Sequence, residues 1–561
     1  MNQSLATRSG GRILVDCLRE QGVEMAFCVP GESYLAVLDA LYLVREQLKL
    51  IVCRQEGGAA FMAEAYGKLT GQPGVCLVTR GPGATNASIG VHTAYQDSSP
   101  MILFIGQIGS NVVEREAFQE MDYRRMFGQM SKWVAQIDRA DRIPEYVSHA
   151  FHLAVSGRPG PIVLALPEDM LVNQAVAPSS RRYVRLQAHA GEHDMQTFRR
   201  MLTAAQRPLL IAGGGGWNKG ACDDLAAFAR SWNVPLAGSF RRQDLLDNRH
   251  PNYAGEIGIA TSAEMKKRVA DADLIVSIGA RLGEMTSGGY SLFGIPELRQ
   301  KFIHVHAGIE ELGRVYAADL MINAGMAEFV AAAKKLAPPE NAAWRDWTAA
   351  MRAEYLATLK TVSSPGALNL SEVVTWLREN IPAQSIITNG AGNFSGWAQR
   401  FYQYTGYRTQ LAPTNGAMGY GVPAAIAASL VHPDRTVVCF SGDGDFLMNG
   451  QELATAAQYQ ARPIFLVINN GMFGTIRMHQ ERDYPGRTHG TDLANPDFAA
   501  LARAYGLHGE IITRTEEFPA AFERARGAGT AALIELRIDP EAITTRTTLS
   551  AIREQARQAG R

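Results

Sequence analysis

Short apolar runs rich in β-branched residues recur along the chain, and each ends in glycine or in a polar side chain. They occupy residues 25–29, 49–53 and 75–79 near the N-terminus, and 436–440 and 464–468 near the C-terminus. Runs that are apolar at every position are typical of strands buried on both faces of a parallel sheet. Helical patterning lies between them, so the chain is predicted to be an α/β protein with doubly wound, mainly parallel sheets.

Breaks in this pattern predict three sheet domains and a tail. Residues 172–197 are polar and contain proline and serine, as expected of a linker, and an Ala- and Trp-rich helical stretch ending in SSPGALN precedes the last sheet. The expected domains are 1–180, 190–340 and 366–545. Residues 546–561 are expected to be a frayed C-terminal tail, with a capping role as the alternative.

The stretch 436–470 carries the most informative chemistry. Its first apolar run ends in a tight turn, SGDGD; a helix follows with Asn449 as its N-cap, and the second run ends in NN. Asp443 and Asn470 therefore follow two parallel strands, at the edge where open α/β sheets bind ligands. Glycine allows backbone N–H groups to approach phosphate, and these oxygen ligands suit Mg²⁺. From this motif alone, a plain turn with solvated acids stays open.

Glu56 occupies a comparable place near the N-terminus. The run 49–53 leads into RQEGG, and the small-residue helix AAFMAEAYGKLTG follows. A single glutamate between a strand end and a helix start is most often a cap favoured by the helix dipole. Its position alone therefore favours a structural role for Glu56.

The blocks RQEGGAA, NGAMGYG and GDG…NN occur in the order found in thiamine diphosphate (ThDP) enzymes. The chain resembles that family over nearly its whole length, and in particular its acetolactate-synthase-like group. The resemblance implies a pyrimidine-binding domain, a middle domain and a diphosphate-binding domain, in that order.

The resemblance also implies roles for individual residues. The Glu56 carboxyl would hydrogen-bond the aminopyrimidine ring and promote loss of the thiazolium C2 proton. The Gly416 carbonyl would face the 4′-amino group, and Met418 would hold the cofactor bent. Mg²⁺ would be bound by Asp443, Asn470 and the backbone carbonyl of Met472. The implied cofactor-binding set is Gly31, Glu56, Asn86, Gly416, Met418, Gly442, Asp443, Gly444, Asp445, Asn470, Met472 and Phe473.

Substrate-side positions are also suggested by resemblance. Phe118 and Gln119 in AFQEMD match active-site positions of the acetolactate-synthase-like group and are taken as catalytic, although core packing is an equal alternative for Phe118. Lys132 matches a family lysine. Asn393 and the polar, glycine-marked segment 472–490, expected to be a mobile lid, complete the specificity region with residues 31–33.

Two departures narrow the substrate class. The paired histidines of simple 2-oxoacid decarboxylases are missing, since VHTAYQDSSP contains only His92. The lid reads MHQER where biosynthetic acetolactate synthases are expected to carry a tryptophan.

The middle domain gives a weaker nucleotide signal. A strand leads into four glycines at 213–216, which either bind a nucleotide or permit close helix–sheet packing. Arg281 in GARLGEM matches the first arginine of a flavin-binding pattern, but Met285 replaces the second, and GSFRRQDLLDN departs from the family's flavin loop. FAD is therefore not expected.

Composition excludes several partners. Lys+Arg and Asp+Glu both number 55, so the net charge is zero and no basic field exists for nucleic acid or a membrane surface. The N-terminal residues MNQSLATRSGGR lack an apolar core, so no signal peptide is expected, and without a long apolar run no membrane span is expected. Six scattered cysteines without paired spacing indicate buried thiols in a reducing compartment, the cytoplasm.

The implied activity is decarboxylation of a 2-oxoacid such as pyruvate, followed by protonation of the resulting enamine or its addition to a carbonyl acceptor. The alternative is a lyase acting on a 2-hydroxyacyl-CoA, a benzoin or a cyclic diketone, although no Arg/Lys cluster marks a CoA groove. A scaffold that binds cofactor without catalysis is disfavoured by Glu56, Asp443 and Asn470. Family members pair two chains with Glu56 facing the partner's diphosphate site, which implies a homodimer as the minimal unit and an expected tetramer.

Overall fold

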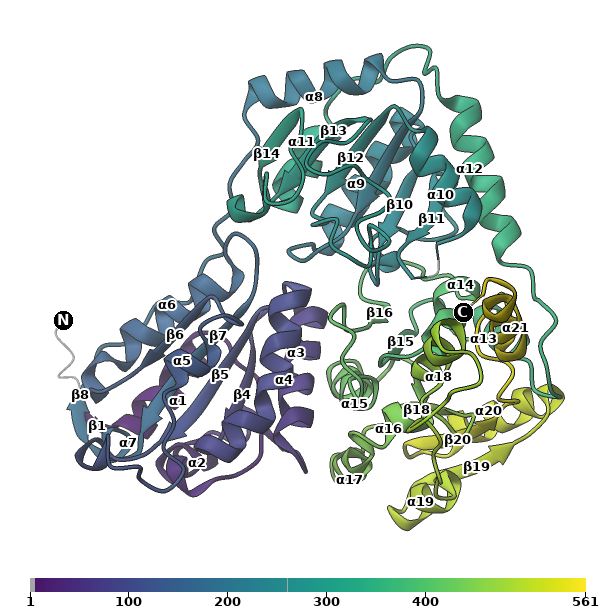
Figure 1. Cartoon of the computed structure of the whole chain (residues 1–561). Coiled ribbons are helices and arrows are strands. Elements are labelled where there is room, and N and C mark those ends of the chain that lie inside the picture. The colour runs from purple at the N-terminus through teal and green to yellow at the C-terminus, as the bar shows by residue number, and fades with distance from the viewer. Residues whose placement is uncertain (1–5, 260, 561) are drawn as a thin grey trace. The chain divides into compact units, whose positions relative to one another are not determined.

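A computed structural model describes residues 6–259 and 261–560. The chain folds into two compact units, Met1–Leu186 and Gln187–Arg561. The first unit contains one six-stranded sheet and the second contains two, and every neighbouring pair of strands within these three sheets is parallel (Figure 1). The fold class predicted from the sequence is confirmed.

The sheet of the first unit has the order β3-β2-β4-β5-β7-β6. A short antiparallel pair, β1 with β8, lies outside it. The strands are β1 Thr7–Ser9, β2 Met25–Cys28, β3 Lys49–Val52, β4 Gly74–Val78, β5 Met101–Gln107, β6 Trp133–Gln136, β7 Pro161–Pro167 and β8 Gln174–Val176. The helices are α1 Gly10–Glu20, α2 Leu35–Tyr42, α3 Glu56–Thr70, α4 Gly81–Asp97, α5 Tyr123–Phe127, α6 Ile143–Val155 and α7 Glu168–Val172.

The second unit begins with a sheet of order β11-β10-β9-β12-β13-β14. Its strands are β9 Pro208–Ala212, β10 Leu236–Ser239, β11 Tyr253–Ile257, β12 Leu274–Ile278, β13 Lys301–His306 and β14 Leu320–Asn323. The helices of this part are α8 Glu192–Ala204, α9 Lys219–Trp232, α10 Ala263–Asp271, α11 Met326–Ala333 and α12 Arg345–Thr358.

The last sheet has the order β16-β15-β17-β18-β20-β19. Its strands are β15 Ile386–Asn389, β16 Gln410–Leu411, β17 Val437–Gly442, β18 Ile464–Asn469, β19 His508–Ile512 and β20 Ala532–Arg537. The helices are α13 Leu370–Asn380, α14 Ser395–Phe401, α15 Gly421–Val431, α16 Asp443–Phe446, α17 Leu453–Gln458, α18 Gly474–Asp483, α19 Phe498–Ala504, α20 Phe518–Gly527 and α21 Leu549–Gln558.

The three sheets use two strand orders. If each sheet's strands are numbered in chain order, the first and last sheets both read 2-1-3-4-6-5, whereas the middle sheet reads 3-2-1-4-5-6. In each case the order reverses next to the first strand, although the first and last sheets also end in an exchanged pair, and a ligand crevice is expected beyond the carboxyl ends of the strands at the first reversal. The reversal lies between β2 and β4, between β9 and β12, and between β15 and β17.

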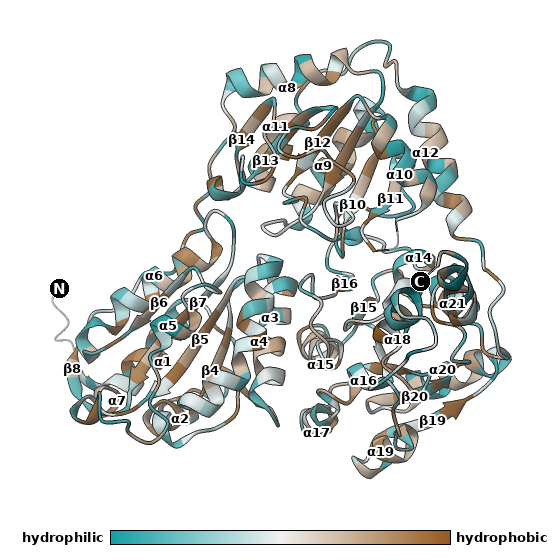
Figure 2. Cartoon of the chain, in the orientation of Figure 1, coloured by the Kyte–Doolittle hydropathy of each residue, from teal (hydrophilic) through white to brown (hydrophobic). Residues whose placement is uncertain are grey.

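Burial of the inner strands, such as β4, β5, β7 and β12, explains why their sequences are almost entirely apolar. Each of the three sheets is packed into its own hydrophobic core, and Figure 2 shows the strands in hydrophobic colours. Among the described residues, no helix is long and apolar enough to cross a membrane.

Two local expectations were wrong and one was right only in part. Residues 441 and 442 continue strand β17, and a short helix rather than a tight turn follows at Asp443. Asn449 takes the N-cap position of the 3-10 turn Gly450–Glu452, as expected, but its side chain does not bond the turn's backbone; the amide donates to the Gly419 carbonyl at 2.9 Å. The C-terminal tail is not frayed: α21 is an ordered helix capped by the Thr548 hydroxyl and packed against α18.

The 172–197 segment is also less irregular than expected. Its start forms β8, which pairs with β1, and its end is the first turns of α8. Residues between them carry no regular structure, so the linker is real but shorter than its composition indicated.

The middle sheet is expected to be sensitive to acid because it buries His304. One ring nitrogen of His304 bonds the Ala280 carbonyl at 3.1 Å and the other has no partner. Burial, with His306 nearby, lowers the pKa of His304 to about 4. Below about pH 6.5 the unfolded chain therefore binds a proton at His304 that the folded chain does not bind. The free energy of unfolding consequently falls as the pH drops through this window.

We predict that this histidine alone costs about 2 kcal/mol of stability between pH 6.5 and pH 5. The His304→Gln variant should lose less stability than the wild type over that interval when denaturant unfolding is measured at both values. Equal losses in the two proteins would contradict the assignment.

Candidate active site

The strand-order reversal of the last sheet brings the predicted diphosphate motif to a sheet edge. Asp443 is the first residue of α16 and follows β17 directly, while Asn470 follows β18, the next strand in the sheet. One Asp443 carboxylate oxygen accepts from the Gly444 N–H at 2.9 Å. The other accepts from the Gly471 N–H and from the Asn495 amide, each at 2.8 Å.

The Asp443 carboxylate is buried, with 3% of its surface exposed, and its hydrogen-bond donors are all neutral amides. Burial therefore raises the pKa of Asp443, while the amide donors oppose the rise. A buried carboxylate without a basic partner is costly unless a cation approaches it. The site is thus chemically suited to a divalent cation, with Asn470 and Met472 beside it.

A cavity of about 230 Å³ opens at this edge. A second cavity, of about 520 Å³, shares Asn393, Gly416 and Thr475 with the first. Nine predicted positions therefore lie together, since the first cavity is lined by Gly416, Met418, Gly442, Asp443, Gly444, Asp445, Asn470, Met472 and Phe473.

Two glycines of this cavity are needed for different reasons. A Cβ on Gly444 would lie 2.5 Å from the Phe473 ring, so only glycine allows the ring to pack over the turn. Gly416 has a φ of +72° with nothing within 4 Å of its Cβ position. Glycine at 416 is therefore required by the left-handed backbone and not by crowding.

Asp445 has a different environment from Asp443. Its carboxylate accepts from the backbone N–H groups of Gly419, at 2.9 Å, and Ala391, at 3.1 Å, and from the Ser441 hydroxyl. Burial raises its pKa to about 6. Asp445 thus fastens the loops after β15 and before α15 to the GDG segment on the wall of the first cavity, and its cofactor-binding role stays a prediction.

In the first unit, Glu56 is the first residue of α3, and the preceding Gln55 caps the helix by accepting from the Gly58 N–H. The Asn86 amide donates to Glu56 Oε2 at 2.9 Å. A Cβ on Gly83 would lie 3.5 Å from Oε1. The carboxyl is half-buried and held by one oxygen, which leaves Oε1 for a ligand.

Gly31 follows β2 at the reversal point of the first sheet. A Cβ there would lie 2.4 Å from the Thr79 side chain, just after β4. Gly31 is therefore placed at the edge where this sheet would receive a ligand, and glycine lets the two strand ends approach.

Phe118 and Gln119 lie on an exposed loop of the first unit. Phe118 is 71% exposed, which rules out core packing within the chain. Gln119 has a φ of +66°, and its carbonyl accepts from the Gly81 N–H at 3.1 Å. Arg80 donates to the Phe118 carbonyl and also pairs with Glu32 and Glu168. Arg80 therefore positions this loop, although nothing in its local sequence indicated it.

Lys132 does not present its ammonium to solvent. The Nζ donates to the carbonyls of Leu153, Ser156 and Arg158 at 2.5–2.8 Å. This lysine closes the C-terminal end of α6, so its match to a family lysine reflects a structural role here.

The segment expected to be a mobile lid is in large part a helix. Residues 474–483 form α18, which packs against α21. The Glu481 carboxylate is buried and bonds the Arg553 guanidinium twice, at 2.6 and 2.7 Å. The same carboxylate accepts from the Gly486 N–H at 2.9 Å, so it also holds the loop after the helix.

Three contributors to the site were missed from the sequence. Asn495 bonds both Asp443 and Asn469, at 2.8 and 2.9 Å. Ile543 lines the first cavity, and its carbonyl accepts from the Asn393 amide. The buried Arg241 donates to the carbonyls of Gly390 and Pro413 on the site loops. None lies in a recognisable motif, because each acts through a contact distant in sequence.

Comparison with known protein families agrees with this geometry. The chain matches "Thiamine pyrophosphate enzyme, N-terminal TPP binding domain" over residues 8–126, "Thiamine pyrophosphate enzyme, central domain" over 195–333, and "Thiamine pyrophosphate enzyme, C-terminal TPP binding domain" over 390–536. The chain belongs to the thiamine pyrophosphate enzyme family, in the group of the acetolactate synthase large subunits.

Its relatives in that group are similar over nearly their full length. The acetolactate synthase isozyme 2 large subunit of Escherichia coli is 30% identical, covering 95% of this chain and 96% of its own. The acetolactate synthase large subunit of Parasynechococcus marenigrum is 32% identical, covering 95% and 88%. A probable acetolactate synthase large subunit of Methanocaldococcus jannaschii is 29% identical, covering 95% and 92%.

The Glu481–Arg553 pair is expected to hold α18 and the following loop in place. We predict that Glu481→Gln lowers the local opening free energy of residues 474–490 by about 1–3 kcal/mol, because a buried charged hydrogen bond is lost. Hydrogen exchange of peptides from this segment and from α21 would measure the change.

The matched control is Arg482→Gln, which removes an exposed pair with Asp483 on the same helix. Such pairs contribute less than about 1 kcal/mol, so protection should barely change. Equal exchange in both variants would show that the Glu481 pair does not stabilise the segment.

Proposed function

We propose that the chain is a ThDP- and Mg²⁺-dependent carboligase of the acetolactate synthase type, acting on pyruvate or a related 2-oxoacid and a carbonyl acceptor. The observation that carries this proposal is the buried Asp443 carboxylate, which has only amide donors around it and therefore favours a cation. It lies at the strand-order reversal of the last sheet. The proposal is supported by Glu56 on the first sheet and by the acetolactate synthase large subunits to which the chain is similar.

The residues of the last sheet fit a diphosphate with its metal. Mg²⁺ would take oxygen ligands from Asp443, Asn470 and the Met472 carbonyl. The Gly444 N–H already bonds Asp443, so the turn would orient the carboxylate toward the ion. Gly416 and Met418, on the wall of the same cavity, would hold the pyrimidine end.

When bound, ThDP supplies a carbanion centre through which a 2-oxoacid can lose carbon dioxide and form a new carbon–carbon bond. The chain positions and shields that centre. Glu56 would hold a proton at Oε1 for the pyrimidine ring, while Asn86 keeps Oε2 in place. Gly31, at the reversal of the same sheet, would let the ring approach the strand ends.

The larger cavity would hold the substrates. Its wall contains Asn393, Thr475 and Met478, and Asn393 is fixed by hydrogen bonds to Thr475 and to the Ile543 carbonyl. Ile476, on α18, is exposed and borders the neighbouring cavity. Phe118 and Gln119 would reach a substrate from the first sheet domain of a partner chain.

The active assembly is proposed to be a homodimer or a tetramer of such dimers, with each site built from Glu56 of one chain and Asp443 of the other. This would cover the exposed Phe118. All six cysteines are buried thiols, which suits a cytoplasmic enzyme.

Flavin is not part of the proposed mechanism. A Cβ on Gly213 would lie 1.9 Å from Ser239 Oγ, and one on Gly214 would lie 2.0 Å from the Gly279 carbonyl oxygen. Close packing of the strand ends therefore accounts for glycine at both positions without a nucleotide.

The first test is a panel of 2-oxoacids with ThDP and Mg²⁺ added or withheld, following carbon dioxide and coupled hydroxyketones. Activity is expected to need both additions and no FAD. Glu56→Gln should lower kcat by at least about 100-fold, since general acid–base groups contribute about 10²–10⁴-fold. Undiminished turnover in Glu56→Gln would remove the role given to Glu56.

The control variant in that test is Glu46→Gln, an exposed position outside the site, which should retain full activity. Activity on no 2-oxoacid, together with cleavage of a 2-hydroxyacyl-CoA, a benzoin or a cyclic diketone, would favour the lyase alternative.

A second test addresses the shared site. Glu56→Gln and Asp443→Asn chains, each inactive alone, are mixed under conditions that exchange subunits. If each site draws on two chains, half of a symmetric mixed dimer's sites are intact, and about one quarter of wild-type activity should return. No recovery, despite exchange verified by tagged chains, would place both residues of a site on one chain.

A further inference from the structure

The segment 238–248, GSFRRQDLLDN, begins at the end of β10 and contains the 3-10 turn Gln243–Leu245. Arg242 and Asp247 are half-buried, and every other residue of the segment is buried. Buried polar groups have to be bonded within the protein, so the partners of this segment indicate its use. Because it departs from the family's flavin loop, a role other than flavin binding has to be sought in those partners.

The segment joins the middle sheet to the last sheet. The Asn248 N–H donates to the Tyr404 carbonyl at 2.8 Å, and the Tyr404 N–H donates to Asn248 Oδ1 at 3.0 Å. Closer to β10, the Gln243 N–H donates to Oε1 of Gln410 on β16 at 2.9 Å. Residues 238–248 thus form a bridging segment that bonds the edge strand β16 and the chain just before it.

Arg241 extends from the bridging segment to two loops of the proposed active site. Its side chain is buried, and its two terminal nitrogens donate to the Pro413 carbonyl and, at 3.1 Å, to the Gly390 carbonyl. The backbone φ of Arg241 is +59°, which residues with a side chain rarely adopt and which persists where the surroundings impose it. One guanidinium therefore holds the loop after β15 and the loop before α15 together.

The Pro413 carbonyl connects Arg241 to Gly416. It also accepts from the Gly416 N–H at 3.1 Å, which closes the turn 413–416. Gly416 has a left-handed backbone and lines both active-site cavities, whereas Arg241 lines only the larger one. Because the bond to Arg241 fixes the first peptide group of a closed turn, it also restricts the direction of the Gly416 carbonyl.

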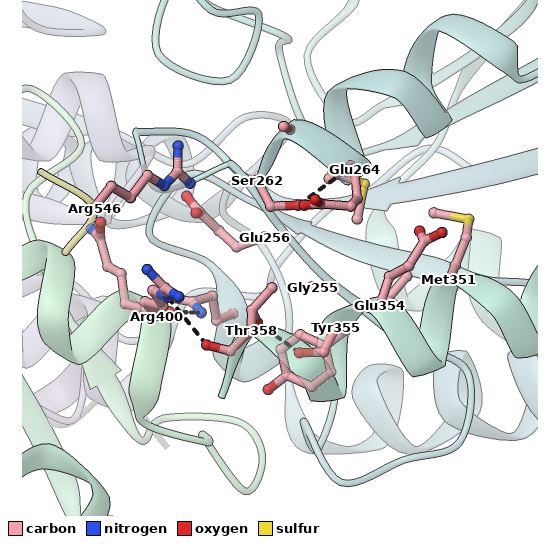
Figure 3. A pocket seen from close by; sticks show the side chains of 15 residues that line it. Gly255, Glu256, Ser262, Glu264, Met351, Glu354, Tyr355, Thr358, Arg400 and Arg546 are labelled. Atoms are coloured by element: carbon pink, nitrogen blue, oxygen red, sulfur yellow. Dashed lines mark hydrogen bonds between the residues drawn. The ribbon is translucent and has the colours of Figure 1, made fainter. Parts of the chain in front are cut away.

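Glu256 lies near Arg241 but does not hold it. It lines a separate cavity of about 320 Å³, as does Gln243 of the bridging segment, and Figure 3 shows its carboxyl on the side where Arg546 lies. Neither of its oxygens has a hydrogen-bond partner among the residues that the structure describes. Burial raises the pKa of Glu256 to about 8, although Arg241 and Arg546 oppose the rise, so this carboxyl is mostly uncharged at neutral pH. The two loop carbonyls, and not an ion pair with Glu256, therefore direct the Arg241 guanidinium.

We propose that Arg241 is a positioning residue of the ThDP site, which holds the turn 413–416 so that the Gly416 carbonyl accepts a hydrogen bond from the 4′-amino group of the pyrimidine. This inference rests on the proposed function and deepens it, because it gives the middle domain a task at the site without a flavin. Arg241 acts through Gly416, and the bridging segment keeps Arg241 in place.

The test is isothermal titration of the full-length chain, in the presence of Mg²⁺, with ThDP and with an analogue that lacks the 4′-amino group. Arg241→Met should weaken ThDP binding at least about fivefold, because the carbonyl no longer faces its donor. The analogue has no such donor, so its affinity should change less than about twofold. A merely structural role for Arg241 would weaken both ligands alike.

Arg241→Lys keeps the buried charge and provides the same comparison if the methionine variant does not fold. One ammonium does not reproduce the planar fork that reaches two carbonyls, so ThDP should bind at least about twofold more weakly, again with little change for the analogue.

The matched control is Arg249→Gln, directly after the bridging segment, which removes an exposed pair with Asp247 and should change neither affinity. Hydrogen exchange of peptides covering residues 411–420, measured without ligand, should be faster in Arg241→Met than in this control. Unchanged ThDP affinity in both Arg241 variants, or equal weakening of both ligands, would overturn this inference alone. ThDP binding without turnover of any 2-oxoacid by the wild type would overturn the proposed reaction alone.

Discussion

A single buried carboxylate, that of Asp443, has to be stabilised inside the protein, and the segments around the last sheet are arranged to do so. Its charge is surrounded by amide donors and not by a basic side chain, so it is stable only if a cation completes its environment. The donors come from three segments: the start of α16, the loop after β18 and the loop before α19. The nearby Asp445 carboxylate accepts hydrogen bonds from the two loops that line the cavity. The fold thus holds an anion in position before any ligand arrives.

Much of this arrangement could be predicted because strands that are buried on both faces of a sheet have continuous apolar sequences. Glu56, Asp443 and Asn470 follow such runs within three residues, so their place at the carboxyl edge of a sheet was evident from the sequence. The strand bounds differ from expectation by only one or two residues, as in β17, which continues to Gly442.

The remainder could not be predicted because it depends on contacts between distant segments. Asn495 reaches Asp443 across 52 positions, and Arg241 reaches Pro413 across 172. The C-terminal helix looked like a frayed tail because its polar composition gives no sign of a partner. Its order comes from Arg553 meeting Glu481, 72 positions away. The local pattern of hydrophobic and polar residues does not predict such pairs.

The Glu481 carboxylate has a consequence for altering substrate choice by mutagenesis. It ties together α18, the loop at Gly486 and α21, and so fixes the helix whose residues Thr475 and Met478 line the proposed substrate cavity. Ile476 is exposed and lines the neighbouring, smaller cavity, so it can be varied while this anchor is kept. A variant library for new acceptors should therefore hold positions 481 and 553 constant, and diversify 476 and 478, which line the smaller and the larger cavity respectively.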